Sequence, residues 1–367
     1  MGEADQEVPV GEPGARYAPG ELERVAAGIL RALGVPGVDA DLVADSLVQA
    51  EVWGHSSHGL LRLPWYVARL RSGAVRADAA ETVLVDTGPL VLLDAADGIG
   101  QVMVERAQRL AVDRARRFGI AGVGVRRSNH FGTAMYFTRR AAERGCVTIL
   151  STNSSPAMAP WGGKEKRVGS NPWSVAAPWR DGVISLDVSN TAVARGKLYL
   201  AKQRGHDIPP DWAIAADGSP TTDPGEGIAG TILPMAGHKG YAISFMMDLL
   251  SGALTGSSVG TSVVGPYVPD GAGGVGHLVL AIDVAAMGPV EDYDARVQQM
   301  VDEVRSSPLA AGHARIHYPG EIEDLAAEAV REAGGLTLPA RTVEELTGLA
   351  AELGVAAPRA TDAPGAD

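Results

Sequence analysis

Residues 51–66, EVWGHSSHGLLRLPWY, gather side chains that could transfer a proton and bind an anion. His58, Arg62 and Tyr66 recur every four residues, so they would share one face of a helix. On that face His58 could protonate an oxyanion, and Arg62 could hold a carboxylate through two parallel hydrogen bonds. Tyr66 would add a hydroxyl group to the same substrate.

Plainer interpretations of the same residues compete with this one. A histidine near a helix end can simply interact with the helix dipole, and Arg62 could be a solvated surface charge. His55-x-x-His58 also invites a zinc site, but a catalytic zinc usually needs three protein ligands. We find no third ligand at a convincing spacing, so we expect no metal.

Two helices would have to position this stretch. Leu42, Val43, Leu47 and Ala50 have helical spacing, which predicts a helix over 39–53. Gly54 suits the position after its end, because glycine adopts the left-handed conformation without a Cβ clash. A second helix starting near residue 57 would then carry the face described above.

The rest of the chain predicts a mixture of helices and short strands. We expect further helices at about 22–33, 101–118, 133–145, 238–254, 291–306, 321–333 and 342–353, the last opened by a Thr342/Glu345 capping box. We expect strands at 82–85, 90–93, 120–125, 146–150, 183–188 and 277–284, and a long loop over 151–172.

Composition limits the classes of function. The 367 residues are 46% hydrophobic and 21% charged, with a formal net charge of −12, which argues against nucleic acid or an anionic membrane as partner. The chain has no apolar run long enough to span a membrane and no secretion signal at its start. Cys146 is the only cysteine and has an apolar setting, so we expect no disulfide and a cytoplasmic location.

Common nucleotide-binding signatures are missing or misplaced. Residues 271–276, GAGGVG, match G-x-G-x-x-G as text, but they precede a strand instead of linking a strand to a helix. We therefore interpret them as a flexible loop. The basic run of Lys164, Lys166 and Arg167 could bind a phosphate, although such runs are usually solvated.

An ordered series of short motifs carries a more specific signal. It comprises His58-Gly59 with Arg62 and Tyr66, Ser128-Asn129-His130-Phe131-Gly132, Asn153 with residues 159–163, residues 169–172, residues 186–189, residues 194–197, His238-Lys239-Gly240 and Pro319-Gly320-Glu321. Over about residues 20–345 the series resembles the type-2 malate/L-lactate dehydrogenase family. That family is unrelated to the Rossmann-fold lactate dehydrogenases and includes sulfolactate and ureidoglycolate dehydrogenases and cyclic imino acid reductases.

The resemblance implies an α/β (α+β) fold with a non-Rossmann NAD(P)-binding domain on a mostly antiparallel sheet. That domain, residues 81–289, would be inserted in a helical substrate-side and dimerisation domain formed by 17–80 and 290–354. Residues 1–16 and 355–367 would be disordered tails. The resemblance also implies a homodimer, NAD or NADP as cofactor and a small carboxylate-bearing substrate.

The resemblance also implies roles for individual residues. His58 and Ser57 match the catalytic pair, with Asp187 near the family's acid, and Arg62, Tyr66 and His130 match substrate-binding positions. The expected cofactor-binding residues are His130, Phe131, Gly132, Thr133, Ala134, Asn171, Pro172, Asp187, Val188, Ser189, His238 and Lys239. Ser170, Ala134 and Asn190 depart from the usual residue types.

The chemistry agrees with these roles. Hydride transfer to a C=O bond leaves negative charge on oxygen, and a histidine with a pKa near 6.5 could supply the proton. Asp187, if close, would orient His58, although a strand-end aspartate can instead cap the next turn; His130 can likewise bond only backbone. We therefore expect a dehydrogenase acting on a 2-hydroxy acid/2-oxo acid pair. A cyclic imino acid reductase and a non-catalytic binding homologue are the alternatives.

Overall fold

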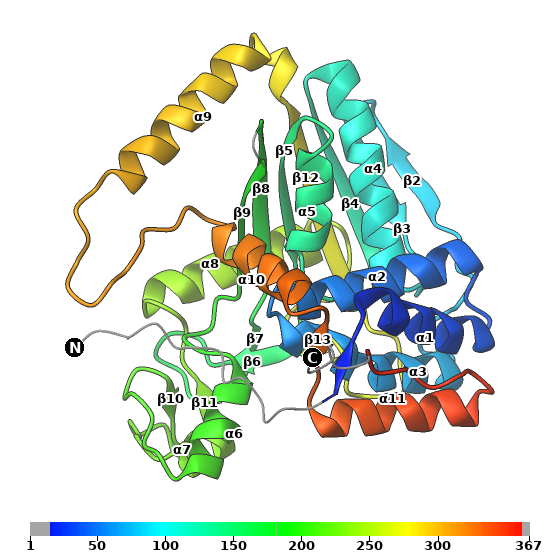
Figure 1. The fold of residues 1–367 in the computed structure, drawn as a ribbon, viewed down its shortest axis with the longest axis vertical. Helices are drawn as coiled ribbons and strands as arrows, with labels where there is room; N and C mark the ends of the chain where they lie inside the picture. Colours follow the sequence, from blue (N-terminus) through cyan, green and yellow to red (C-terminus); the bar gives the residue numbers. More distant parts are fainter. Residues whose placement is uncertain (1–14, 181, 362–367) are drawn as a thin grey trace, which may run out of the picture.

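The computed structural model describes residues 15–180 and 182–361, and its centre is a seven-stranded sheet (Figure 1). The strands are β2 (Thr82–Asp86), β3 (Leu90–Asp94), β4 (Ile120–Ser128), β12 (Val275–Asp283), β5 (Cys146–Thr152), β8 (Trp173–Trp179) and β9 (Gly182–Val188), in that spatial order. Only β3 and β4 pair in parallel, and the other neighbours are antiparallel. This confirms the predicted mixed fold on a mostly antiparallel sheet.

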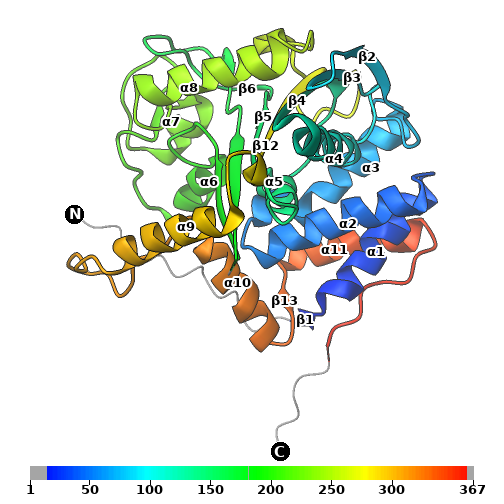
Figure 2. The same ribbon diagram turned by 90° about the horizontal axis from the view of Figure 1, so that it is seen from above.

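Helices cover this sheet on both faces. α4 (Gly100–Phe118) packs on β4 and β12, and α5 (Met135–Ala142) packs on β5 and β8. α8 (His238–Asp248) and the π-helical turn Leu249–Ala253 after it lie on the opposite side (Figure 2). The alternation of buried residues in β5, Cys146, Thr148 and Leu150, reflects burial of one strand face against helices.

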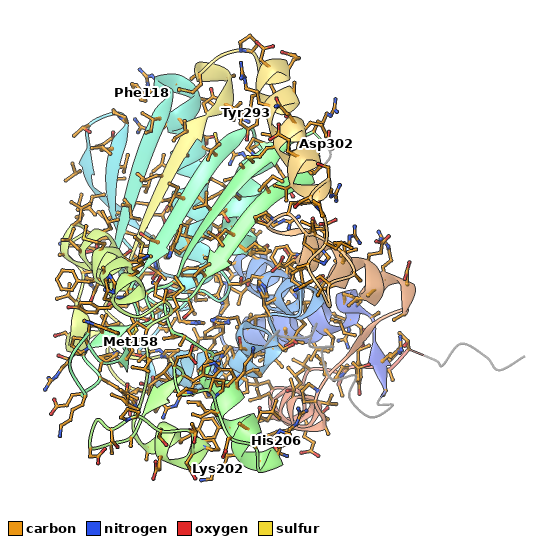
Figure 3. All side chains as sticks on the ribbon, turned by 90° about the vertical axis from the view of Figure 1, so that its left-hand side faces the viewer. Phe118, Met158, Lys202, His206, Tyr293 and Asp302 are labelled. Carbon is orange, nitrogen blue, oxygen red and sulfur yellow. The ribbon has the colours of Figure 1, made fainter. Side chains whose placement is uncertain are left out.

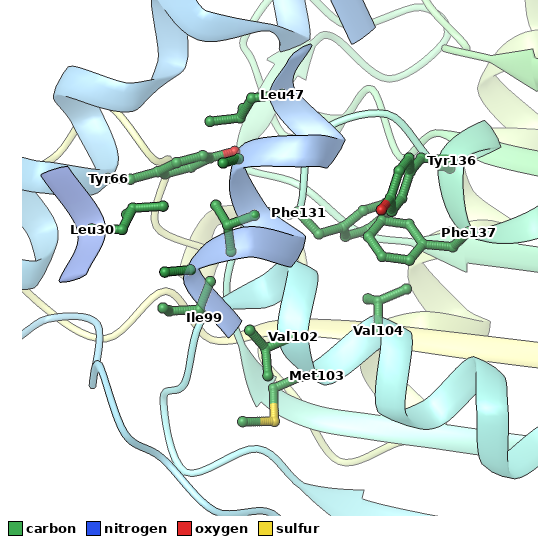
Figure 4. Close-up of a cluster of buried hydrophobic side chains, with 14 of the residues drawn as sticks. Leu30, Leu47, Tyr66, Ile99, Val102, Met103, Val104, Phe131, Tyr136 and Phe137 are labelled. Atoms are coloured by element: carbon green, nitrogen blue, oxygen red, sulfur yellow. The ribbon is translucent and has the colours of Figure 1, made fainter. Parts of the chain in front are cut away.

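A layer of helices from both ends of the chain packs beside α4 and α5. It contains α1 (Pro19–Ala32), α2 (Gly37–Val52), α3 (Leu63–Ser72) and α11 (Ala340–Glu352). One apolar core joins this layer to the sheet, and Figure 4 shows part of it, from Leu30 and Tyr66 to Phe137. This core contains residues from both sides of position 81, so the segments on either side of the predicted domain boundary pack against each other.

A second, smaller sheet of four strands is formed by residues between 156 and 232. Its order is β10 (Ala213–Ile214), β11 (Thr231–Ile232), β6 (Pro156–Met158) and β7 (Val168–Gly169), with α6 (Arg195–Arg204) and α7 (Pro224–Ala229) beside it. Leu198, Ile208 and Ala213 form its own small core. The loop predicted over 151–172 thus contains two short strands, because pairing with distant segments supplies the order that local sequence lacks.

The helices near the C-terminus divide between two parts of the molecule. α9 (Val290–Arg305) lies along the outer strands, where Val297 and Val301 pack on Trp179 and the Tyr293 hydroxyl donates to the Pro178 carbonyl (Figure 3). α10 (Glu321–Glu332) instead reaches α2. Residues 290–305 therefore belong with the sheet and not with the helical layer.

Both chain ends within the described residues are anchored. β1 (Arg16–Tyr17) pairs with β13 (Leu336–Thr337), and the Thr361 amide donates to the Arg16 carbonyl. The disordered tails predicted to span 1–16 and 355–367 are therefore wrong for residue 16 and for 355–361, because backbone pairing and contacts hold both segments. Residues 1–14 and 362–367 lie outside the described residues.

Two further expectations for local structure need correction. α11 begins at Ala340 with Pro339 at its N-cap, so Thr342 lies inside the first turn and forms no capping box. Residues 271–274 form a loop leading into β12, as predicted, but Val275 and Gly276 are already the first two residues of that strand. A Cβ on Gly276 would lie 1.8 Å from the Ser251 carbonyl oxygen, so this end of the glycine run is packed against its neighbours. In the residues that the structure describes, no helix has the length and apolar character needed to cross a membrane.

Candidate active site

The segment that carries His58 is a pair of short turns between two helices. α2 ends at Val52, Gly54 has φ +76°, and 3-10 turns follow at Ser56–His58 and Leu60–Arg62 before α3 begins. The single helix predicted to start near residue 57 is therefore wrong. Gly59 has an extended ψ of −148°, which separates the turns, and Pro64 lacks an N–H group and so suits the first turn of α3.

Glu51 braces these turns from inside the protein. Its buried carboxylate accepts a hydrogen bond of 2.8 Å from the Leu60 amide. A Cβ on Gly59 would lie 2.1 Å from the same carboxylate, so only glycine fits there without movement. These contacts of Glu51 hold the backbone of the turns that carry His58.

His58 lies in the wall of a cleft of about 650 Å³ between the helical layer and the smaller sheet. His55, Ser57 and Arg62 line the same wall. The opposite side and floor are formed by Gly132, Thr133, Ala134, Ala157, Lys166, Ser170, Pro172, Asp187, Ser189, residues 191–198, Trp212 and residues of α7 and β11. Segments far apart in the sequence thus meet at one site.

His58 is neutral in this setting at physiological pH. Its Nδ1 lies 2.9 Å from the Ser57 hydroxyl. Burial lowers the pKa of His58 to about 4, with further lowering by Arg62 and His55 and an opposing effect of the Asp187 carboxylate. The pKa of His58 thus lies below the value near 6.5 expected from the sequence, and the neutral ring keeps one nitrogen available to accept a proton.

Arg62 is oriented by two contacts that leave the end of its guanidinium available. Its Nε donates to the Ser57 carbonyl at 2.6 Å, and the guanidinium lies 4.0 Å from the ring centroid of Trp65. Among the described residues no carboxylate pairs with Arg62, so its terminal nitrogens can bind an acid group in the cleft.

Tyr66 and His130 form a second pair behind His58. The rings of His58 and His130 are stacked with centroids 5.8 Å apart, and the Tyr66 hydroxyl lies 2.7 Å from His130 Nδ1. Since the Gly132 amide also donates to Nδ1 at 3.3 Å, Nδ1 is the acceptor and Tyr66 is a donor. Burial raises the pKa of Tyr66, which keeps this donor protonated, and burial lowers the pKa of His130 well below its usual value.

The Tyr66 hydroxyl, which was expected to bind the substrate, is directed at His130 in the structure. Tyr66 and His130 both line a separate, small and mainly apolar cavity, and neither is part of the cleft wall. Tyr66 acts on the site through His130.

Asp187 caps a helix from a neighbouring strand. Its Oδ2 accepts hydrogen bonds from the Thr133 hydroxyl at 2.7 Å and from the Met135 amide at 2.8 Å, at the start of α5. No hydrogen bond joins it to His58 among the described residues, so its influence on His58 is through charge. Thr133 also contacts His55 Nδ1 at 3.1 Å, and His55 Nε2 lies 3.3 Å from Glu323, which ties α10 to the cleft.

Half of the twelve residues expected to bind cofactor reach the cleft wall: Gly132, Thr133, Ala134, Pro172, Asp187 and Ser189. The Phe131 ring is buried against Phe137 and His277, so it has no free face for another ring. Asn171 is buried, and its amide donates to the Ser244 carbonyl. Val188, His238 and Lys239 are outside the cleft wall, with His238 against Trp161.

The cleft is also lined by Lys166, Arg195, Lys197 and Trp212. Lys166 was considered from the sequence only as part of a basic run that could bind a phosphate, and the other three were not expected to be site residues. The Ala194-Arg195-Gly196-Lys197 motif was the available signal for two of them. The unusual Asn190 is buried and bonds Trp173, Ser170 and Asn171, so its role is to hold the strand that borders the cleft. In the described residues, no group of three or more His, Cys, Asp or Glu side chains could hold a metal ion.

Comparison with known proteins agrees with this architecture. The model of the malate/L-lactate dehydrogenase family matches residues 17–347, so this chain belongs to that family. It is 38% identical over 340 residues to L-sulfolactate dehydrogenase of Methanothermobacter thermautotrophicus, covering 93% of this chain and 98% of that protein. It is 41% identical over 287 residues to (2R)-3-sulfolactate dehydrogenase (NADP(+)) of Chromohalobacter salexigens, covering 77% and 86%.

Solved structures show the same fold. Sulfolactate dehydrogenase from Methanocaldococcus jannaschii superposes with a TM-score of 0.89 at 34% identity, covering 93% of this chain and 98% of that one. Delta1-piperideine-2-carboxylate reductase from Pseudomonas syringae superposes with a TM-score of 0.79 at 27% identity, covering 91% and 99%. Family membership confirms the predicted resemblance and the predicted class, an NAD(P)-dependent dehydrogenase.

Proposed function

We propose that this protein interconverts a 2-hydroxy acid and a 2-oxo acid, with His58 as the proton-transferring group and Arg62 as the carboxylate clamp. The observation that carries the proposal is their arrangement: a half-buried histidine with a lowered pKa and an oriented arginine without an acidic partner among the described residues share one cleft wall. A base beside an anion clamp suits removal of a proton from a hydroxyl group next to a carboxylate. The names of the relatives, dehydrogenases of malate and sulfolactate, support this substrate class.

The cleft fits a nicotinamide dinucleotide as well as a substrate. Its volume of about 650 Å³ lies within the range of cofactor sites, and four cationic side chains line it against one carboxylate. When bound, the nicotinamide accepts or supplies the hydride. Gly132, Thr133, Ala134, Pro172 and Ser189 are the residues that we propose to hold it, since they line the cleft at the ends of β4, β8 and β9.

Side chains of the protein would then transfer the proton and bind the substrate carboxylate. His58 Nε2 takes the hydroxyl proton in the oxidation direction, while Ser57 bonds Nδ1 and keeps the ring in place. The imidazolium that forms is stabilised by the charge of Asp187. Arg62 fixes the carboxylate, and Tyr66 holds His130 with Nε2 protonated and Nδ1 occupied.

Reduction of a cyclic imino acid is the second candidate. The fold of the piperideine-2-carboxylate reductase favours it as an alternative. Both reactions need a carboxylate clamp, but an iminium substrate brings its own proton and has less need of His58.

Three further properties are part of the proposal. We propose a homodimer in which one subunit helps to close the site of the other, as expected for the family. We propose a cytoplasmic location, supported by a single cysteine, Cys146, that is buried and free. We also propose residues 81–289 as the cofactor-binding part, with α9 attached to it.

A substrate panel tests the main proposal. Oxidation of NADH and NADPH would be followed at 340 nm with pyruvate, oxaloacetate, sulfopyruvate and piperideine-2-carboxylate. Turnover of the 2-oxo acids with loss in the His58→Ala variant supports the main proposal. Turnover of the imino acid alone would replace it with the second candidate, and binding without any turnover would leave only the non-catalytic alternative.

A further inference from the structure

The cleft carries more positive charge than one substrate carboxylate requires. Lys166, Arg195 and Lys197 line it in addition to Arg62, whereas Asp187 is the only carboxylate among the described residues that line it. The whole chain has a net charge of −12, so this concentration of cations runs against the average of the molecule. A positive hollow in a negative protein attracts and holds anions.

These three cations have no acidic partners in the part of the chain that the structure describes. Among the described residues no ion pair or side-chain hydrogen bond involves Lys166, Arg195 or Lys197, and the Nζ of Lys197 lies over the Trp212 ring, 6.0 Å from its centroid. Most other arginines of the protein are paired, for example Arg167 with Glu165 in the same loop as Lys166. Cations left unpaired around a cavity keep their hydrogen-bond donors for a ligand.

The three side chains also line the same cleft. Burial, and then the charge of Arg195, lowers the pKa of Lys166, which agrees with their placement in one cleft. Arg195 and Lys197 belong to the first turn of α6, and residues 194–198 face the cleft with the positive end of that helix. Ser189 and Thr191, whose hydroxyls are 3.0 Å apart, line the same wall and add neutral donors.

We infer that Lys166, Arg195 and Lys197 form a second oxyanion subsite, separate from the Arg62 clamp. It would take a carboxylate, sulfonate or phosphate group carried by what binds in the cleft. This inference rests on the proposed function and adds to it: the subsite selects either a dianionic 2-hydroxy acid over a monoanionic one, or the phosphate groups of the cofactor. Both sources share the same recognition chemistry.

Three charge-neutral variants test the subsite: Lys166→Gln, Arg195→Gln and Lys197→Gln. Lys164→Gln is the matched control, because it removes the same charge from an exposed residue of the Lys166 loop that is not in the cleft wall. For each variant we would measure kcat/KM for oxaloacetate and for pyruvate, and the Kd of NADH and of NADPH by fluorescence titration. Thermal unfolding of each variant checks that it folds.

The kinetic and binding measurements distinguish a subsite that binds the substrate from one that binds the cofactor phosphates. If the subsite binds the substrate, the ratio of kcat/KM for oxaloacetate to that for pyruvate falls about tenfold or more, the usual effect of losing a charged hydrogen bond. If it binds the cofactor, the Kd of NADH or NADPH rises by a similar factor while that ratio stays constant. In both cases added salt weakens binding to the wild type more than to the variants.

The inference is overturned if none of the three variants changes these quantities by more than Lys164→Gln does. Failure of the proposed function is a separate result. A wild-type protein that reduces no 2-oxo acid would refute the function, while binding of NADPH and of inorganic phosphate by calorimetry would still decide whether the subsite exists.

Discussion

The surroundings of His58 change its pKa and therefore its protonation state in the free protein. Because burial lowers its pKa to about 4, the free protein holds it neutral across the physiological range. A base works in its neutral form, so activity is lost as pH falls through this pKa and is retained above it. The acid form needed for reduction requires a bound anion near the ring to raise the pKa again.

His58→Ala should lower kcat for hydroxy acid oxidation by about 100-fold, the usual effect of losing a general base. In the wild type, kcat/KM should be level from about pH 6 to pH 8 and fall only toward pH 4, as the pKa shift of His58 implies. Initial rates over this range give both quantities. The exposed His206, at the end of α6 (Figure 3), offers His206→Ala as control. An inflection near pH 6.5 would contradict the effect of burial.

Arg62→Lys should raise KM for the carboxylate substrate by about 10-fold or more with a smaller change in kcat. The guanidinium can bond Ser57, lie over Trp65 and still present two nitrogens, whereas an ammonium group cannot do all three. Steady-state kinetics with oxaloacetate or malate measures this. Arg71→Lys, on the α3 helix that follows Arg62 but outside the cleft, should leave KM unchanged; an unchanged KM in Arg62→Lys would place the clamp elsewhere.

At the level of elements, Asp187 links the sheet to α5. Asp187→Ala should lower the free energy of unfolding by about 1 kcal/mol, the usual value of a helix cap. Asp187→Asn should keep most of that stability, because an amide oxygen can still accept from Met135 and Thr133, but it should lower the pKa of His58 further. Urea unfolding and pH–rate profiles of both variants separate the two roles. Equal destabilisation by both variants would contradict capping through one oxygen.

The elements that the sequence predicted best are those with a strong local pattern. The amphipathic helices, and strands such as β3 and β5, lie within a few residues of their predicted ranges, and Gly34, Gly54 and Gly119 end helices at positive φ. The pair of turns at 56–62 was missed because it depends on a close approach of the Gly59 backbone to the Glu51 carboxylate, which would collide with a Cβ at residue 59. Glu51 lies eight positions earlier in the chain, and no local pattern reveals this contact. β8 was also missed, since its order comes from pairing with β5 and β9.

For the site as well, the sequence motifs indicated some features and not others. The structure brings His58, Arg62 and residues 132–134, which the motifs named, to one cleft. The motifs did not show that Tyr66 faces His130, because that depends on how α3 begins. They also did not separate Lys166 from its neighbours Lys164 and Arg167: Lys166 lines the cleft, whereas the other two are exposed and outside its wall.

At the scale of the whole molecule, the helices from the two ends of the chain cover each other's apolar faces, since α1 and α11 pack together in the main core. These helices belong to the segments 17–80 and 290–354, which the family resemblance made the expected dimerisation domain. Uncovered apolar side chains instead follow α8 and the π-helical turn after it: Phe245, Met246, Leu249 and Leu254, of which Leu254 is 63% exposed. Figure 2 shows this helix on an outer face of the molecule.

We therefore predict that the protein is a homodimer, twice the 38.0 kDa of one chain, and that α8 contributes to the interface. Large exposed apolar patches on a folded protein commonly mark such contacts, because covering them removes apolar area from water. Phe245→Glu would place a charge in that contact and should shift sedimentation toward the monomer. Met287→Glu, at a residue 84% exposed and away from α8, is the control and should leave the dimer intact. Loss of activity together with dissociation would show that one subunit completes the site of the other. A wild type that is fully active as a monomer at assay concentration would refute the dimer, and a dimer unaffected by Phe245→Glu would move the interface off α8.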